Sequence, residues 1–413
     1  MFDIEKWQEI FSSIRSNKLR TFLTGFSVAW GIFMLMILLG SGKGLENGFR
    51  KEFEEEATNG IWIRPGQTSI AYKGIQPGRH LEFTLEDYEL LKRELEHYID
   101  VISAEYYIFG WGGSAVNYKN LQGQYSLRGI FPEHRLIEFT EATEGRFLNR
   151  LDIENREKVC IIGSSVKEEM FKDENPVGKY VKIAGVPFKI VGVFKEELGQ
   201  NERGKVYVPL TTAQRVYSGH NKIDEIALVT KSFSVEESQK IVNKIKELLA
   251  KKHQFALEDP RAVHIYNNLE QYETFTTIFG GINAFIWLIG IGTLIAGVIG
   301  VGNIMMVIVK ERTKEIGIRK AIGATPASIV ALIIQEAIVI TTFFGYVGLV
   351  LGINLMELVS KTVPPNQIFT NPDLDFNTAL TATIILIVAG TLAGISPAYQ
   401  AAKLKPIEAL RDE

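Results

Sequence analysis

Charged residues are distributed very unevenly along this chain, and four long stretches contain almost none. Residues 21–42, 274–309 and 376–402 carry no charged side chain, and residues 321–356 carry only Glu336. A helix that crosses a bilayer needs roughly 20 apolar residues. Because the core helices of soluble proteins rarely extend so far without a charge, this pattern predicts four membrane-spanning helices.

The segment between the first two predicted spans has the opposite character. Residues 43–273 hold 68 of the 93 charged residues and alternate short strand patterns with helical ones. We expect strands at 59–66, 101–109, 124–130, 159–162, 187–194 and 206–209, and helices capped by Thr84 with Asp87 and by Ser234 with Glu237. The predicted fold class is an α-helical four-span membrane domain with a large α+β external domain on a helical stalk.

The overall composition hides this division and excludes several functions. The net charge of -3 indicates no basic surface for nucleic acid. The single cysteine, Cys160, excludes an intramolecular disulfide, and its place in a predicted buried strand suggests an inert thiol. None of the six histidines has a sequence neighbour at metal-ligand spacing, and no serine lies in a nucleophile-elbow motif. We therefore expect no catalytic residue and no metal site.

Lysine and arginine flank the predicted spans asymmetrically, which indicates their orientation. They cluster before the first span, in residues 310–320 and after residue 402, whereas the loop at 357–375 has only Lys361. Both termini and the 310–320 loop are expected in the cytoplasm, with residues 43–273 outside. The leader is expected either to lie on the inner membrane face as an amphipathic helix or to be a plain helical extension.

These expectations divide the chain into nine segments. They are the leader 1–20, the first span 21–42, the external domain 43–273, the stalk end and second span 274–309, a cytoplasmic helix 310–326, the third span 327–356, an external loop 357–375, the fourth span 376–402 and the tail 403–413. As one helix, residues 274–309 would extend about 54 Å, well beyond a hydrocarbon core of roughly 30 Å. We therefore expect a stalk that transmits motion, with a rigid spacer as the alternative.

Two spans carry small residues at four-residue spacing. They are Gly292, Ala296 and Gly300 in the second span, and Gly348 and Gly352 in the third. Such stripes allow close helix contacts, within one chain or between two copies.

Glu336 is the one acid inside a predicted span. A charge within a membrane is costly, so Glu336 is either a functional residue or lies near the inner interface, where it caps or pairs with a cytoplasmic lysine.

The cytoplasmic segment 310–326 alternates charges with Ile316, Ile318 and Ile322. A solvated loop needs no isoleucines, so we expect a short amphipathic helix that docks a cytoplasmic partner. The sequence Gly-Ser-Gly-Lys-Gly at 40–44 lacks the earlier glycine and the following hydroxyl of a phosphate-binding loop, which argues against a nucleotide site in this chain.

Several motifs resemble those of FtsX/MacB-type permeases. The sequence KERTKEIGIRKAIGATP at 310–326 is similar to the cytoplasmic signature of that family, and the IIQEAIV context of Glu336 follows it. The tail at 396–410, the entry to the first span at 17–24 and external motifs between 127 and 193 also match in order. The resemblance covers nearly the whole chain.

This resemblance implies a non-catalytic permease subunit of an ATP-binding-cassette transporter of the mechanotransmission type. In MacB the ATPase is fused to the N-terminus, whereas this chain begins 20 residues before its first span. ATP and Mg would therefore be bound by a separate ATPase subunit, and no cofactor is expected in this chain. The implied docking residues are Glu311, Arg312, Glu315, Ile316, Arg319 and Lys320. The external domain would be porter-like, with an inserted subdomain near 111–221.

The resemblance also implies a setting and further partners. The chain would lie in a bacterial inner membrane among its lipids, as a homodimer or paired with a homologous permease. A periplasmic adaptor and an outer-membrane channel are further expected partners, for a cargo that the sequence does not name. The alternative function is an FtsX-like regulator that activates an envelope hydrolase without transporting a substrate.

Overall fold

This computed structural model describes residues 18–54, 57–110, 113–195, 204–362, 369–370, 372 and 376–404. The expected leader, up to residue 17, lies outside these residues, as do most of the loop at 363–375 and the tail beyond residue 404. The chain divides into two compact units. Unit 1 comprises residues 1–49 and 278–413, and unit 2 comprises residues 50–277.

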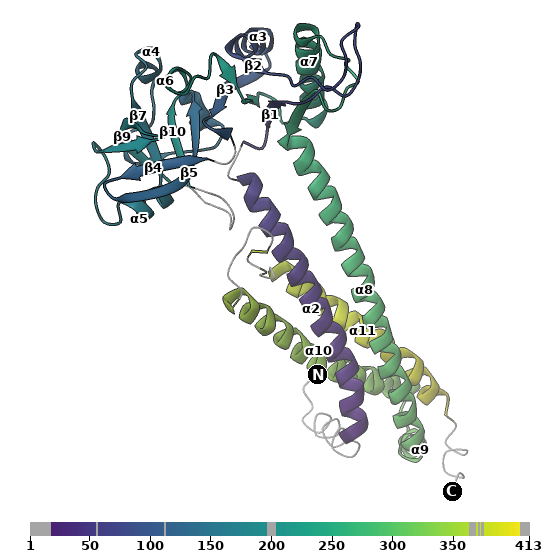
Figure 1. Cartoon of the computed structure of the whole chain (residues 1–413). Coiled ribbons are helices and arrows are strands. Elements are labelled where there is room, and N and C mark those ends of the chain that lie inside the picture. Colours follow the sequence, from purple (N-terminus) through teal and green to yellow (C-terminus); the bar gives the residue numbers. More distant parts are fainter. Residues whose placement is uncertain are drawn as a thin grey trace. The chain divides into compact units, whose positions relative to one another are not determined.

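Unit 1 is built from helices (Figure 1). They are α2 (Lys18–Glu54), α8 (Asn268–Glu311), α9 (Thr313–Ala321), α10 (Pro326–Thr362) and α11 (Phe376–Lys403), of which α2 and α8 continue into unit 2. Within α2, α8, α10 and α11 lie four segments long and apolar enough to cross a membrane. Many of their large apolar side chains are exposed in the chain, among them Trp30, Phe285 and Phe343. Such a surface suits lipid rather than water.

Close helix contacts hold unit 1 together. A Cβ atom added at Gly348 of α10 would lie 2.2 Å from the backbone oxygen of Ala29 in α2. One added at Gly394 of α11 would lie 3.0 Å from the Cβ of Ala337 in α10. Small residues at these points let the backbones approach one another, as is common between membrane helices.

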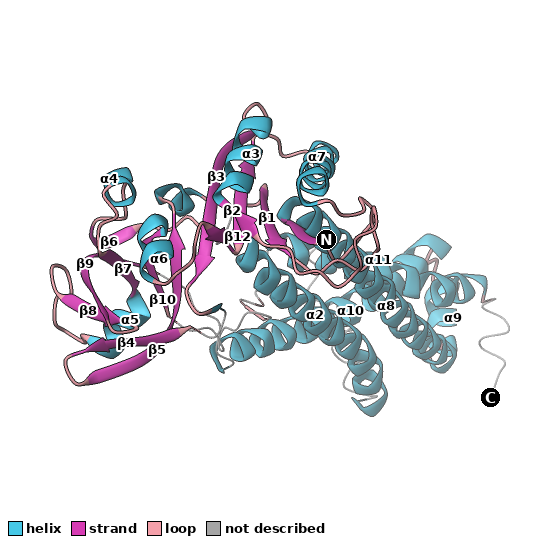
Figure 2. Cartoon of the chain, turned by 45° about the horizontal axis from the view of Figure 1, so that its top comes forward, coloured by secondary structure: helices cyan, strands magenta, loops and turns pink. Residues whose placement is uncertain are grey.

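Within the described residues, unit 2 contains the strands and six helices shorter than the long helices of unit 1 (Figure 2). The strands are β1 (Gly60–Pro65), β2 (Phe83–Thr84), β3 (Ile99–Tyr107), β4 (Ser114–Tyr118), β5 (Leu121–Ile130), β6 (Ala142–Gly145), β7 (Val159–Gly163), β8 (Tyr180–Ile183), β9 (Val186–Phe194), β10 (Lys205–Pro209), β11 (Lys222–Ile223), β12 (Glu225–Thr230) and β13 (Val263–Asn267). The helices are α3 (Leu85–Leu95), the 3-10 helix η2 (Pro132–Leu136), α4 (Arg150–Glu154), α5 (Ser164–Met170), α6 (Leu210–Val216) and α7 (Val235–His253).

The large sheet of unit 2 has two parts that meet at β5. Strands β10, β7, β9, β8, β4 and β5 follow one another, and a parallel pairing of β10 with β5 closes them into a ring. From β5 the sheet continues through β3, β12, β1 and β13. The ring is formed by residues 114–209, within the range expected for an inserted subdomain, and it joins the remaining sheet through the β3–β5 pairing.

The sequence predicted caps for two helices of unit 2, and the structure confirms one of them but not the other. Thr84 and Asp87 form the predicted capping box at the start of α3. Ser234 occupies the cap position of α7, but its side chain makes no capping hydrogen bond, and its amide, from which Glu237 would have to accept, donates to Ser232 Oγ at 3.0 Å. The predicted cap by Ser234 and Glu237 is therefore wrong in detail.

Candidate functional site

The short helix α9 ends in a well-defined cap that leads directly into α10. At its C-terminal end, Gly323 adopts a φ of +108°, and the amides of Gly323 and Ala324 donate to the carbonyls of Lys320 and Arg319 at 3.1 and 2.9 Å. This is a Schellman cap, which glycine favours because it has no Cβ. Thr325 then caps α10, and Pro326 fills its first position. The Gly-Ala-Thr-Pro sequence thus turns the chain sharply from α9 into α10.

Four side chains of alternating charge form a series from α9 to α10. We call this series the inner ladder, and it consists of Arg319, Glu315, Arg312 and Glu336. Arg319 Nη2 donates to Glu315 Oε1 at 2.8 Å, and Glu315 Oε2 lies 4.0 Å from Arg312 Nε. Arg312 Nη1 then donates to Glu336 Oε2 of α10 at 3.4 Å. Glu336 is buried, and Arg312, at the junction of α8 and α9, pairs with it. Pairing of Glu336 with a cytoplasmic lysine, considered from the sequence, stays a prediction.

Two of the predicted docking residues point into the chain. Ile316 is 6% exposed and belongs to the apolar core of unit 1. Lys320 Nζ donates to the carbonyls of Ala402 and Leu404 at 2.7 Å each, at the end of α11. The prediction that Ile316 offers a docking surface is wrong, because the apolar side of α9 faces the spans, and Lys320 anchors α9 to α11.

The outer side of α9 remains accessible and borders a groove. Glu311 and Glu315 are exposed, and so are Ile318 and Ile322, the latter by 82%. A groove of about 510 Å³ lies beside Ile322 and the first turns of α10. It is lined by Arg319, Ile322, Ala324, Ser328, Ile329, Ala331, Leu332 and Gln335. An exposed isoleucine beside a partly apolar groove is suited to a protein contact.

Of the two small-residue stripes predicted from the sequence, one packs against another helix of the chain and the other does not. Gly348 and Gly352 lie against α2, where an added Cβ would approach Ala29 and Met36. Gly292 and Gly300 face open space, since an added Cβ at either would have nothing within 4 Å among the described residues, and Ala296 between them is exposed. The first stripe is used for packing within the chain, and the second is accessible.

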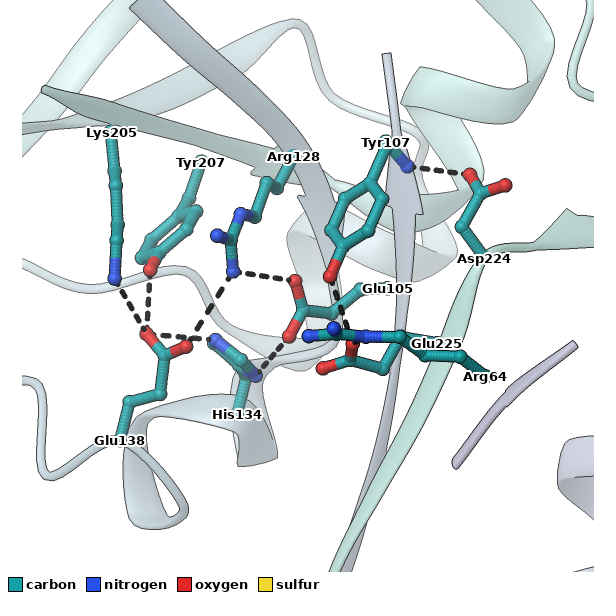
Figure 3. A network of polar contacts seen from close by, with 10 residues as sticks. All are labelled: Arg64, Glu105, Tyr107, Arg128, His134, Glu138, Lys205, Tyr207, Asp224 and Glu225. Atoms are coloured by element: carbon teal, nitrogen blue, oxygen red, sulfur yellow. Dashed lines mark hydrogen bonds and ion pairs between the residues drawn. The ribbon is translucent and has the colours of Figure 1, made fainter. Parts of the chain in front are cut away.

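Unit 2 contains a second charged site, which the sequence did not reveal (Figure 3). We call it the external cluster, and it consists of Glu105, Arg128, His134, Glu138, Lys205 and Tyr207. These residues come from β3, β5 and β10 and from η2 and the residues after it, where the ring meets the rest of the sheet.

Each carboxylate of the external cluster has several partners. Arg128 Nη1 donates to Glu105 Oε2 at 3.0 Å and lies 3.6 Å from Glu138 Oε1. The Tyr207 hydroxyl donates to Glu138 Oε2 at 2.7 Å, and Lys205 Nζ lies 3.7 Å from the same oxygen. Although burial alone would raise the pKa of Glu138, the charges of Lys205, His134 and Arg128 hold it well below its ordinary value.

His134 bridges the two carboxylates. Its Nδ1 lies 3.4 Å from Glu105 Oε1, and its Nε2 lies 3.2 Å from Glu138 Oε2. Neither ring nitrogen has a hydrogen-bond partner among the described residues, so these are charge contacts: a neutral imidazole would turn a lone pair toward one carboxylate, whereas the doubly protonated ring is attracted to both. Burial alone would lower the pKa of His134, but the charges of Glu138 and Glu105 outweigh burial and raise it.

The structure also brings three metal-ligand groups together, which corrects the expectation that no histidine has such a partner. Ligand atoms of Glu105, His134 and Glu138 all lie within 4.8 Å of one another. Arg128 and Lys205 already balance the two carboxylates, and the Tyr207 hydroxyl occupies one of the oxygens. A divalent cation there would add positive charge to a site that is already neutralised, so the geometry suits an ion-pair cluster better than a metal centre.

A neighbouring carboxyl extends the external cluster toward β1. Glu225 of β12 accepts hydrogen bonds from the Arg64 guanidinium and from the Tyr107 hydroxyl, the latter at 3.0 Å. Burial and the nearby charge of Glu105 raise the pKa of Glu225 to about 7, although Arg64 opposes this. The polar contacts therefore continue from the ring across the sheet to β1.

The comparisons with known proteins match both units. Residues 21–246 match the family described as MacB-like periplasmic core domain, and residues 287–406 match the FtsX-like permease C-terminal family. The chain is 26% identical over 414 residues to the macrolide export ATP-binding/permease protein MacB of Bdellovibrio bacteriovorus, covering 99% of this chain and 62% of that protein. It therefore spans about three fifths of the length of this relative.

Two further proteins are similar. An uncharacterized ABC transporter permease of Methanocaldococcus jannaschii is 27% identical over 409 residues, which cover 98% of this chain and 96% of that protein. The crystal structure of the periplasmic region of MacB from Actinobacillus actinomycetemcomitans is 21% identical, with a TM-score of 0.44, and covers 55% of this chain and 96% of that one.

Proposed function

Because this chain belongs to the family of FtsX/MacB-like ABC transporter permeases, we propose that it is a permease subunit of the mechanotransmission type. The predicted family resemblance is confirmed, and so are the four apolar helices and the large domain of strands and helices in the predicted fold class. In the proposed mechanism, a separate ATPase subunit binds at α9, and its nucleotide cycle moves the membrane helices. Those helices in turn move the external domain for export or for handling of an envelope substrate.

The way α9 is attached to the spans supports this proposal most directly. A single intervening residue, Arg312, joins it to α8, the Arg312–Glu336 pair joins it to α10, and Lys320 joins it to the end of α11. A force on the exposed side of α9 would therefore reach three spans at once. The groove beside Ile322 offers the apolar contact, and Glu315 and Arg319 offer charges that give specificity to a protein partner.

Two long helices provide an output for this movement. Helix α8 has 44 residues and is about 66 Å long at 1.5 Å per residue, roughly twice the hydrocarbon thickness of a bilayer. Helix α2 has 37 residues and also continues past the boundary between the two units. A continuous helix resists bending, so we propose that these two helices are the stalk that carries movement out of the membrane.

We further propose that two permease chains pair through the accessible stripe of α8. An added Cβ at Gly292 or Gly300 would have no described residue within 4 Å, and Ala296 between them is exposed, so small residues lie open on this face of α8. The second chain is a copy of this one or a homologous permease. The proposed setting is the inner membrane, with both termini in the cytoplasm and unit 2 outside, as the lysine and arginine distribution indicates.

Capture of a partner ATPase by the full chain tests the docking proposal. We expect an ATPase to co-purify with the wild type and the captured amount to fall at least about tenfold in the double variant Glu315→Lys/Arg319→Glu, since tenfold corresponds to only 1.4 kcal/mol. The matched control exchanges Glu357 and Lys361, another exposed pair four residues apart, at the end of α10. Undiminished capture by the α9 variant would show that the partner binds elsewhere.

Cysteine cross-linking tests the pairing proposal. A cysteine at Ala296 should form a disulfide between two chains, whereas one at Leu392, which is also exposed and lies on α11, should not. Cys160 is fully buried, so it does not compete. Equal cross-linking at both positions would mean that the stripe of α8 has no special role.

A further inference from the structure

We infer that the Arg312–Glu336 ion pair is the joint through which movement of α9 reaches the third span, and that Glu336 is a positioning residue for this step. The inference rests on the proposed function, because it concerns how docking at α9 is passed on. It goes further by separating two roles of the inner ladder. Glu315 and Arg319 belong to the docking side, whereas Arg312 and Glu336 belong to the transmission side.

Arg312 occupies the point where the chain leaves one helix and enters the next. It is the single residue between α8 and α9, with a φ of -95° and a ψ of 13°. Its amide donates to the Ile308 carbonyl at 3.0 Å, and its carbonyl accepts from the Ile316 amide at 2.9 Å. The backbone at Arg312 is therefore bonded to both helices. A side chain fixed at this position senses any change in the angle between α8 and α9.

Glu336 occupies a position where packing alone would favour an aliphatic residue. Its side chain is 4% exposed, and the neighbouring positions on the same face of α10 are the buried Ile329, Ile333, Ala337 and Ile340. A carboxylate among such residues in a membrane helix is costly and is kept where it has a partner and a role. Arg312, 24% exposed, supplies a partner from outside α10.

The surroundings of this ion pair leave room for adjustment. All four residues of the inner ladder line a cavity of about 20 Å³, together with Met305, Ile308, Val309, Ile316, Ile329, Leu332 and Ile333. That volume is large enough for about one water molecule. The Arg312–Glu336 contact is a single hydrogen bond at 3.4 Å rather than a bidentate pair, so it restricts the orientation of the Arg312 guanidinium less than a bidentate pair would. Such a joint can move and still transmit force.

Substitutions on the docking side and on the transmission side of the inner ladder should therefore cause different defects. A change at Glu315 or Arg319 should release the ATPase, as proposed above. A change at Glu336 should leave the outer side of α9 intact and retain the ATPase, but the nucleotide cycle should no longer move α10. A purely structural role for Glu336 would instead lower stability and capture together.

The test uses the full chain in lipid nanodiscs with the ATPase that co-purifies with the wild type. Spin labels are placed at Ile291→Cys on α8 and Leu351→Cys on α10, both exposed positions, in a Cys160→Ala background. In the wild type, trapping the ATPase with ATP and vanadate should shift the distance distribution between the labels. In Glu336→Gln the captured ATPase should stay within about twofold of the wild type, a difference of less than half of 1 kcal/mol, while the shift is lost.

The charge-swapped variant Arg312→Glu/Glu336→Arg should restore the shift, and Arg312→Gln should lose it. The swap also decides the matter if Glu336→Gln folds poorly. The matched control, Glu357→Gln, removes an exposed acid of α10 and should change neither readout. A normal shift in Glu336→Gln, or a swap no better than Arg312→Gln, would overturn the inference alone. Failure of the wild type to capture any ATPase would overturn the proposed function itself.

Discussion

The external cluster and the inner ladder use the same kinds of side chain in opposite ways. In the external cluster, Arg128 and His134 each face both Glu105 and Glu138, so the contacts form a closed network. In the inner ladder, each charge faces the next in a line, at 2.8, 4.0 and 3.4 Å. In the external cluster Glu105, His134 and Tyr207 are fully buried and the other three side chains are at most 26% exposed, whereas the inner ladder includes the half-exposed Glu315 and ends at the buried Glu336.

This difference indicates what each site can do. A closed and desolvated network tolerates little displacement, because any movement leaves a buried charge unpaired. It therefore fixes the ring of strands to the rest of the sheet in unit 2. A linear series with a small cavity beside it can lengthen at one link and shorten at another. The external cluster is thus suited to rigidity and the inner ladder to movement.

Removing the central cation of the external cluster should have the largest effect. In Arg128→Met, the carboxylates of Glu105 and Glu138 lose their shared partner while they remain buried. We expect a loss of about 3–5 kcal/mol in the free energy of unfolding, which is typical when one member of a buried ion pair is removed. Hydrogen exchange of peptides from β3, β5 and β10 in the full chain measures it.

The control for that prediction is Arg93→Met, which removes a 72% exposed arginine of α3 that pairs with its neighbour Glu94. Exposed pairs contribute at most about 1 kcal/mol, so exchange in β3 and β5 should hardly change. Similar effects of the two substitutions would mean that the external cluster does not lock unit 2.

The second prediction concerns how the stability of unit 2 depends on pH. The pKa of His134 is raised above its ordinary 6.5, so its contribution to stability is complete below that pH and is lost as the pH rises through the folded-state pKa. The pKa of Glu225 is raised from 4.5 to about 7, so the cost of ionising it in the folded state grows as the pH rises across that interval. Both groups therefore favour folding at mildly acidic pH.

Other carboxyls limit this trend at low pH. The pKa of Asp87 is lowered to about 2, since hydrogen bonds from His253, Lys252 and Thr84 outweigh the effect of burial. Its stabilising contribution is present above its ordinary pKa and is lost as the pH falls toward 2. We expect unit 2 to unfold at a higher temperature near pH 5.5 than at pH 8. The variants His134→Gln and Glu225→Gln should each flatten this difference, and an unchanged slope in both would assign it to other groups.

The sequence predicted the membrane helices and missed the external cluster for one physical reason. Spans such as Pro326–Thr362 are visible because a bilayer excludes charge over a continuous stretch of chain. The external cluster joins residues that are far apart in sequence. Glu105 meets His134 across 29 positions, and Arg128 lies opposite Tyr207 only because β10 pairs with β5. The four-residue spacing of His134 and Glu138 is present in the sequence, but it was not recognised there as a possible ligand pair.

The inner ladder was partly predictable. Glu315 and Arg319 lie four apart on one helix, and Glu336 stood out as a lone acid in an apolar span. Its pairing with Arg312 depends on the Schellman turn at Gly323, which folds α10 back beside the α8–α9 junction. Periodicity also placed isoleucines on α9 without showing that Ile316 faces inward while Ile318 and Ile322 face outward. Which side of a short helix is covered depends on its neighbours.

A smaller effect is expected from a single hydroxyl of the external cluster. Tyr207→Phe removes the hydrogen bond to Glu138 but keeps the ring stacked on Phe194, with centroids 4.9 Å apart. A hydrogen bond to a charged group contributes about 1.5–3 kcal/mol, and we expect a loss of that size in the stability of unit 2. Tyr180→Phe, at a 63% exposed tyrosine of β8, is the matched control and should be neutral. Equal behaviour of the two variants would indicate that Glu138 is satisfied without Tyr207.

The smallest effect on stability should come from the outer link of the inner ladder. Glu315→Gln removes the negative charge of the group that accepts from Arg319. Both side chains are partly exposed. Helix pairs four residues apart contribute about 0.3–0.5 kcal/mol, so the thermal unfolding of the full chain should shift very little. The same pair is proposed to bind the ATPase, so capture should fall while stability stays constant. If Glu315→Gln instead destabilised unit 1 as strongly as Arg128→Met destabilises unit 2, the inner ladder would be a structural lock, and the contrast with the external cluster would be lost.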